Sequence, residues 1–131
     1  MSTYPSDLRY TNDHEWLRDA GRNVTVGLIQ FAVDQLGEST LVDLPKEGDL
    51  VTKGQRFGTI ESVKSVSDLY APCSGTVAKV NAALKDAPEL VNQSPYDDAW
   101  LIKIRIGDPA ELDALMDAAA YDEFIENEAG H

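Results

Sequence analysis

Residues 57–75 read FGTIESVKSVSDLYAPCSG, and this stretch decides the fold class. It contains two strand-like runs, 57–61 and 68–71, on either side of the five residues 62–66. Strands joined by a loop of about two to five residues usually pair as an antiparallel hairpin. The segment therefore predicts a β-hairpin whose loop carries one lysine, Lys64, near its middle.

Strand patterns continue on both sides of this hairpin. Upstream, Val24, Val26 and Leu28 alternate with Thr25 and Gly27, which is the period of a half-buried strand. Further strands are predicted at 40–44, 75–80 and 100–106. In the last of these the even-numbered residues share one face, and they are Trp100, Ile102, Ile104 and Ile106. The chain is therefore expected to be mostly β.

Two segments predict helix instead. Residues 31–36 are apolar at Phe31, Val33 and Leu36 and are followed by Gly37, which indicates a short helical turn with a glycine cap. After residue 107 the sequence Asp108-Pro-Ala-Glu111 has the features of a helix start. An apolar stripe follows at helical spacing, formed by Leu112, Leu115, Met116, Ala119, Tyr121, Phe124 and Ile125. We therefore expect C-terminal α-helices from about residue 108.

Length and charge limit the classes of function. A chain of 131 residues is expected to form one domain, here a β core at about 8–106 with a helical appendix at 108–128. The 11 basic and 23 acidic residues give a net charge of −12. This charge argues against binding to nucleic acid or to an anionic membrane, because both require a basic surface. It also favours a monomer.

The sequence contains no sign of export or of a membrane anchor. No apolar run approaches the ~18 residues of a membrane span, and the first residues lack the basic and apolar regions of a signal peptide. The one cysteine, Cys73, excludes an intrachain disulfide. A cytoplasmic protein is therefore expected.

Lys64 is the residue of greatest chemical interest. A lysine at the tip of a turn is usually a solvated charge, and the local sequence alone favours that interpretation. Its neighbours Ser62, Ser65 and Ser67 are small, however, and leave the amine sterically open.

Four short motifs surround Lys64 in a fixed order, namely Glu61-Ser-Val-Lys64, Ser67-Asp68, Ala71-Pro72 and Ser74-Gly75. This segment resembles the lipoyl-attachment hairpin of the glycine cleavage H-protein family. Further motifs of that family match in the same order along most of the chain, at Tyr10, His14-Glu15-Trp16, Gly27-Leu28, Ala32, Leu36-Gly37-Glu38, Leu44-Pro45, Gly48, Val80-Asn81, residues 88–92, Pro95-Tyr96 and Trp100. Several independent motifs in one order argue against chance agreement.

The resemblance implies a non-catalytic carrier with a flattened β barrel-sandwich hybrid fold and helices near the C-terminus. Lys64 would hold lipoate through an amide bond. Glycine decarboxylase (P protein) would load the arm with the aminomethyl group of glycine, aminomethyltransferase (T protein) would remove it, and dihydrolipoamide dehydrogenase (L protein) would reoxidise the dithiol. A related alternative is an H-like protein that passes lipoyl groups to other complexes.

The same resemblance implies how Lys64 becomes modified. A lipoyl ligase, or a lipoyl transferase acting with lipoate synthase, would recognise the hairpin through Glu61, Val63 and Ser65. Glu61 has an alternative interpretation as a solvated carboxylate at a strand end. Biotin carriers normally have methionines on both sides of their lysine, and the lipoyl domains of 2-oxoacid dehydrogenases usually show Asp-Lys-Ala. Both patterns are absent here.

In this family the loaded arm folds back into a cleft that excludes water, which suppresses hydrolysis. The residues at matching positions that could hold the cationic amine are Glu15 and Asp68. Gln35 borders the cleft by the same resemblance, and His14 is a further candidate. Each has a structural alternative: an acid on a strand face for Glu15, a turn cap for Asp68, and a hydrogen-bonded structural histidine for His14.

Two positions depart from the family pattern. Ala99 precedes Trp100 where glycine is usual, so a positive φ there would cost ~1 kcal/mol, whereas a need for a small side chain alone would change nothing. Cys73 replaces an apolar residue and is interpreted as a small buried hydrophobe.

An enzyme built on a Cys73–His14 or Glu15–Asp68 pair is the alternative of a different class. No oxyanion or metal-ligand spacing accompanies either pair.

Overall fold

The computed structural model describes residues 7–11, 14–20, 23–29, 32–34, 37–96, 98–107 and 109–129. Within them the strands are β1 (Arg9–Tyr10), β2 (Glu15–Ala20), β3 (Asn23–Leu28), β4 (Ser39–Asp43), β5 (Leu50–Val51), β6 (Arg56–Ser62), β7 (Val66–Tyr70), β8 (Gly75–Val80) and β9 (Ile102–Ile106). The helices are α2 (Ala83–Asp86), α3 (Leu90–Gln93), the 3₁₀ helix η1 (Pro109–Ala114) and α4 (Ala118–Ala129).

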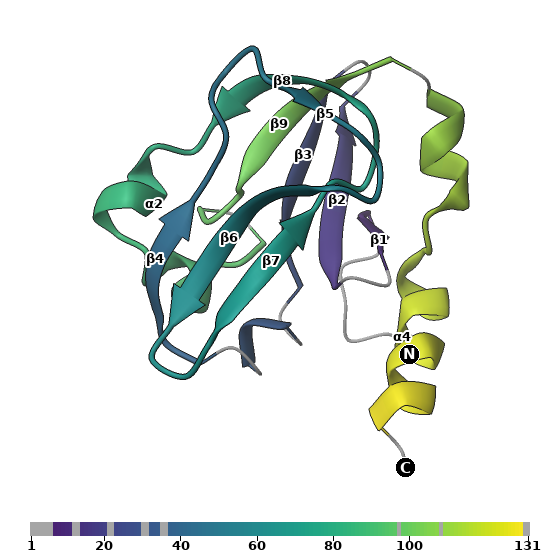
Figure 1. The fold of residues 1–131 in the computed structure, drawn as a ribbon. Helices are drawn as coiled ribbons and strands as arrows, with labels where there is room; N and C mark the ends of the chain where they lie inside the picture. Colours follow the sequence, from purple (N-terminus) through teal and green to yellow (C-terminus); the bar gives the residue numbers. More distant parts are fainter. Residues whose placement is uncertain are drawn as a thin grey trace.

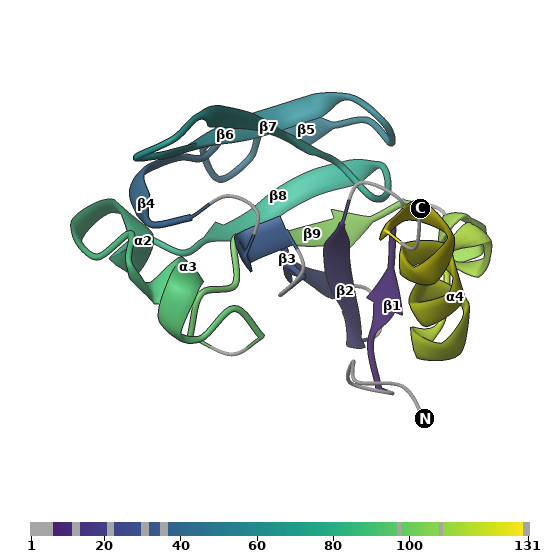
Figure 2. The same cartoon turned by 90° about the horizontal axis from the view of Figure 1, so that it is seen from below.

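The strands form two antiparallel sheets that face each other across the core (Figures 1 and 2). One sheet has the order β1-β2-β3-β9-β8-β5, and the other has the order β4-β6-β7. Fully buried side chains from both sheets fill the space between them, among them Leu17, Val24, Ile60, Leu69 and Ile104. The expected mostly β, flattened barrel-sandwich architecture is confirmed.

A second hydrophobic cluster attaches the C-terminal helix α4 to the edge of the larger sheet (Figure 2). It contains Leu8, Tyr10, Trp16, Ile29, Ala118 and Tyr121. The rings of Tyr10 and Tyr121 stack with centroids 5.2 Å apart. Both faces of β2 are therefore covered, one by the main core and one by this cluster.

The predicted hairpin is present, but its loop is shorter than expected. β6 and β7 leave only residues 63–65 between them, instead of the five residues 62–66. Ser62 N donates a hydrogen bond to Ser65 O at 2.8 Å, and Val66 pairs with Glu61, so the strands extend further towards the tip. Lys64 is the central residue of the loop.

The helical turn predicted at 31–36 is present at residues 32–34, while Phe31, Gln35 and Leu36 lie outside the described residues. Gly37 has φ +85°, and its N–H donates to Val33 O at 3.2 Å. The predicted glycine cap is therefore confirmed, since this left-handed conformation favours glycine.

The C-terminal helices expected from about residue 108 are present, but the first of them is the 3₁₀ helix η1 and a short non-helical segment precedes α4. The chain forms η1, then an isolated β-bridge between Met116 and Tyr10, and only then α4. Tyr10 N donates to Met116 O at 2.7 Å and Met116 N donates to Tyr10 O at 2.9 Å, which removes both groups from a helical ladder. Asp117 caps α4 by accepting a hydrogen bond from Ala120 N, and Asp108 lies outside the described residues.

The helices α2 and α3 had no counterpart in the predicted elements. Each has four residues, which is too short to show a helical period. They lie on the side of the molecule away from α4 (Figure 1). Among the described residues, no helix is long and apolar enough to cross a membrane.

Candidate functional site

The tip of the β6–β7 hairpin presents Lys64 to solvent. Ser62 shapes the tip: its Oγ accepts hydrogen bonds from Lys64 N at 3.2 Å and Ser65 N at 3.1 Å, and donates to Ser65 O at 3.2 Å. A serine that binds backbone groups two and three residues ahead holds a turn in one shape. The loop is therefore ordered while the lysine side chain remains accessible.

The aliphatic part of Lys64 lies over Gly37, in the segment that precedes β4. A Cβ atom added at Gly37 would be 3.2 Å from Lys64 Cε and 3.7 Å from Cδ. The hairpin is also joined to this segment through its backbone, since Val63 N donates to Glu38 O at 3.1 Å. Residues 37–39 thus form a platform beneath the tip.

Asn92, in α3, fixes this platform. Its Nδ2 donates to Gly37 O at 2.7 Å and its Oδ1 accepts from Ser39 N at 2.9 Å. Asn92 belongs to the motif Asn-x-x-Pro-Tyr at 92–96, but sequence reasoning assigned it no task at the hairpin. No spacing in the sequence indicates that its amide reaches a segment more than 50 residues away.

Asn92→Ala is expected to lower the free energy of unfolding by about 2 kcal/mol, because a backbone acceptor and a backbone donor both lose their partner. Urea unfolding measures this change, with Asn23→Ala as control, since Asn23 is exposed on β3 and should tolerate the change within about 0.5 kcal/mol. Equal stability of the two variants would contradict the platform role of Asn92.

Glu15 lies at the start of β2 and is buried, with 1% of its surface exposed. Its Oε2 accepts a hydrogen bond from Tyr70 N at 2.8 Å. This contact connects the larger sheet to the edge strand β7 of the smaller sheet. Because water screens a buried carboxylate only weakly, Glu15 would attract a cation strongly.

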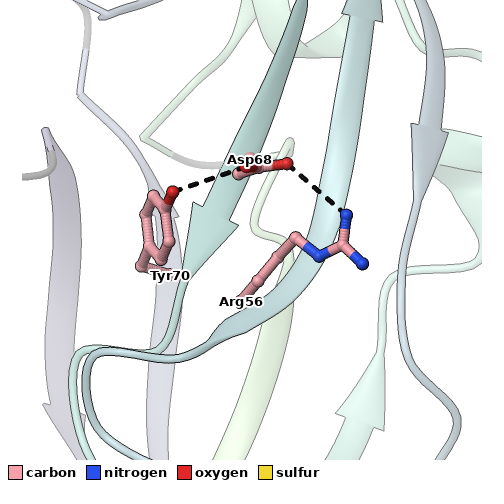
Figure 3. Close-up of polar contacts among 3 residues, drawn as sticks. All are labelled: Arg56, Asp68 and Tyr70. Carbon is pink, nitrogen blue, oxygen red and sulfur yellow. Dashed lines mark hydrogen bonds and ion pairs between the residues drawn. The ribbon is translucent and has the colours of Figure 1, made fainter.

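Asp68 lies two residues earlier on β7 and is partly exposed. Its Oδ1 is 3.6 Å from Arg56 Nη1, and its Oδ2 accepts from Tyr70 Oη at 3.4 Å (Figure 3). Tyr70 therefore contacts both predicted cleft acids, Asp68 through its hydroxyl and Glu15 through its backbone. Glu15, which lies on β2, therefore contacts β7, the strand that carries Asp68.

The other predicted cleft residues have different positions. His14 Nδ1 lies 2.8 Å from Tyr121 Oη, and its ring packs against Tyr121 and Phe124 of α4. These contacts favour the structural interpretation of His14. Gln35 lies outside the described residues.

Cys73 is fully buried in the main core. Burial raises the pKa of its thiol to about 12, the nearby Glu111 carboxylate adds to the rise, and Lys53 opposes it. Because a nucleophilic cysteine must be a thiolate, this environment argues against an enzyme that uses Cys73. Among the described residues, no group of three or more His, Cys, Asp or Glu side chains could hold a metal ion.

Ala99 tolerates its departure from glycine. Among the described non-glycine residues only His14 has a positive φ, so the backbone at Ala99 is not strained. Ala99 is buried, and its N–H donates to Ser94 O at 3.0 Å. The position therefore requires a small side chain and not the flexibility of glycine.

Comparisons with known proteins agree with this geometry. The family model described as "Glycine cleavage H-protein" matches residues 8–128. The glycine cleavage system H proteins of Anaeromyxobacter sp. (strain K) and Symbiobacterium thermophilum are 52% and 50% identical to the chain over 124 residues, which is 95% of the chain and 97% of each relative. The crystal structure of a glycine cleavage system H protein from Mycobacterium marinum superposes with a TM-score of 0.82 at 35% identity, covering 98% of this chain and all of that one.

Proposed function

Because this chain belongs to the glycine cleavage H-protein family, we propose that Lys64 is the residue through which it carries lipoate. The protein is a lipoyl carrier of the glycine cleavage system and not an enzyme, and it interacts with the P, T and L proteins. The observation that supports Lys64 is its position at the centre of an ordered three-residue loop, where its side chain is exposed.

The residues around Lys64 suit a covalently attached arm. When bound, lipoate supplies a disulfide that accepts the aminomethyl group of glycine and is later restored by oxidation. The chain itself supplies an accessible amine, a loop held by Ser62, and a glycine platform that leaves room for the stem. Glu61, Val63 and Ser65 are the residues that we propose a lipoyl ligase, or a transferase acting with lipoate synthase, recognises on the hairpin.

Glu15 and Asp68 are the carboxylates that we propose hold the cationic amine of the loaded arm. Their shared contact with Tyr70 supports this assignment, because one strand then determines the positions of both. Glu15 is the stronger candidate, since its carboxylate is buried while that of Asp68 is already paired with Arg56.

Glu15→Gln is expected to shorten the lifetime of the loaded carrier about tenfold, because a charge-assisted hydrogen bond contributes about 1.5–3 kcal/mol and glutamine cannot supply the charge. Glutamine can still accept the Tyr70 N–H hydrogen bond, so the fold should be kept. Intact-mass spectra recorded after removal of P protein measure the loss of the aminomethyl group. A lifetime equal to that of Glu47→Gln, an exposed control, would rule out this role.

The proposed function is tested by intact-mass analysis after incubation with lipoate, ATP and a lipoyl ligase, followed by glycine–bicarbonate exchange with P protein. We expect a mass gain of one lipoyl group and then exchange activity. A wild-type chain that stays unmodified would contradict the proposed lipoyl-carrier function. Full lipoylation without exchange would instead favour the relay of lipoyl groups to other complexes.

A further inference from the structure

Large hydrophobic side chains are unusually exposed around Lys64. Among the described residues the exposed ones are Leu41 (46%), Leu50 (82%), Val63 (66%) and Val66 (62%). Val63 lies in the loop itself, and Val66 and Leu41 lie on the two strands that flank β6. Leu50 lies on β5, at the opposite end of the molecule from the hairpin tip (Figure 1). We call Leu41, Val63 and Val66 the tip patch.

Strand register places Leu41 and Val66 of the tip patch on one face of the small sheet, while Val63 lies in the loop at its end. Leu41 pairs with Glu61, and Glu61 pairs with Val66, so these three side chains form one row across β4, β6 and β7. The next row on the same face is Asp43, Thr59 and Asp68. The intervening Val42 and Ile60 point into the core. The row next to the tip therefore has a hydrophobic residue on each side of Glu61, and the row beyond it carries two aspartates.

The charge of this face indicates the charge of its partner. Glu61, Asp43 and Asp68 border the tip patch, while the nearby Arg56 is already paired with Asp68. A partner that covers hydrophobic side chains with carboxylates between and beside them needs an apolar surface that also carries lysine or arginine. The overall charge of −12 favours encounter with such a surface.

The chemistry at Lys64 decides which partner must cover the patch. Amide formation joins Nζ to the carboxyl carbon of an activated lipoyl group and releases the activating group and a proton. The attaching enzyme must therefore approach a bare lysine side chain to bonding distance. Before lipoate is attached, only the lysine side chain separates the amine from the loop. The attaching enzyme must therefore contact the surface around the loop. Enzymes that act on the far end of the finished arm can stand further away.

We propose that the tip patch and its acidic border form the docking surface for the enzyme that attaches lipoate to Lys64. The proposal rests on the proposed function and adds β4 and β7 to the hairpin residues that this enzyme recognises. Leu41 is the informative residue, because it lies beside Glu61 of the hairpin only in the folded protein and belongs to neither strand of the hairpin.

The test is a steady-state lipoylation assay with a lipoyl ligase, lipoic acid and ATP, followed by intact mass. The double variant Leu41→Thr/Val66→Thr is compared with Leu50→Thr, which changes a still more exposed hydrophobe away from the tip. Threonine is β-branched, a shape that strands favour. We expect kcat/KM to fall at least tenfold in the double variant through a raised KM, and to stay at the wild-type value in Leu50→Thr.

Lipoylation of the double variant at the rate of Leu50→Thr would overturn the proposal. Normal lipoylation with slower loading by P protein would also overturn it and assign the tip patch to that enzyme. Urea unfolding checks that both variants are folded, and Val66→Thr alone replaces the double variant if they are not. A wild-type chain that gains no lipoyl group would contradict the proposed function itself, which is a separate outcome.

Discussion

Lys64→Arg is expected to abolish lipoylation and, with it, all glycine-dependent exchange with P protein. Arginine keeps the positive charge and a long stem, so an exposed position should tolerate it without loss of stability. Its guanidinium does not become the amide that anchors the arm. In the wild type the same reaction removes the lysine charge and changes the net charge from −12 to −13, whereas the variant stays at −12.

The matched control is Lys53→Arg. Lys53 also lies in an exposed turn, between β5 and β6, and its backbone N–H donates to Ser74 Oγ at 2.9 Å. It should be lipoylated at Lys64 and active at the wild-type level. A lipoyl group on the Lys64→Arg protein would contradict the assignment of Lys64 and show that another lysine is the attachment site.

Trp16→Ala is expected to lower the free energy of unfolding by about 3–5 kcal/mol, the range for removing a buried tryptophan. Trp16 is fully buried, and its Nε1 donates to Pro95 O at 2.8 Å. The ring fills the space above Gly27, where an added Cβ would be 2.3 Å from ring carbons. The variant therefore leaves a cavity and an unpaired carbonyl between β2 and the segment that follows α3.

Urea unfolding of Trp16→Ala and Trp100→Ala gives the comparison. Trp100 is half-buried, and the Lys103 ammonium lies 5.1 Å from its ring centroid, so its loss should cost less. If both variants lost the same stability, the burial of Trp16 would not be the cause.

The elements formed by local pattern were predictable. The alternation at 24–28 and 100–106 gave β3 and β9, and Gly37 marked a real cap. The C-terminal helices were predicted, but the break between them was not, because the bridge between Met116 and Tyr10 interrupts an otherwise helical stripe. Such a bridge depends on strand β1 arriving beside Met116, which no local propensity shows.

The site divides in the same way. The motifs around Lys64 predicted the hairpin and singled out the lysine that we propose carries lipoate, although the local sequence alone favoured a solvated charge. The contacts of Asn92 with the platform, and of Glu15 with Tyr70, each join side chain to backbone across more than 50 residues. Almost every residue offers a backbone N–H and C=O group. The type of residue that Asn92 or Glu15 contacts therefore gives no clue in the sequence that the contact exists.

The platform beneath Lys64 has a consequence for when the carrier can be modified. It brings together residues 37–39, the hairpin loop and Asn92, three segments that meet only after the chain has closed long loops. An enzyme that reads this shape meets its substrate only in a completed molecule. An enzyme that attached lipoate to Lys64 by recognising this shape would therefore modify folded chains in preference to nascent or misfolded ones.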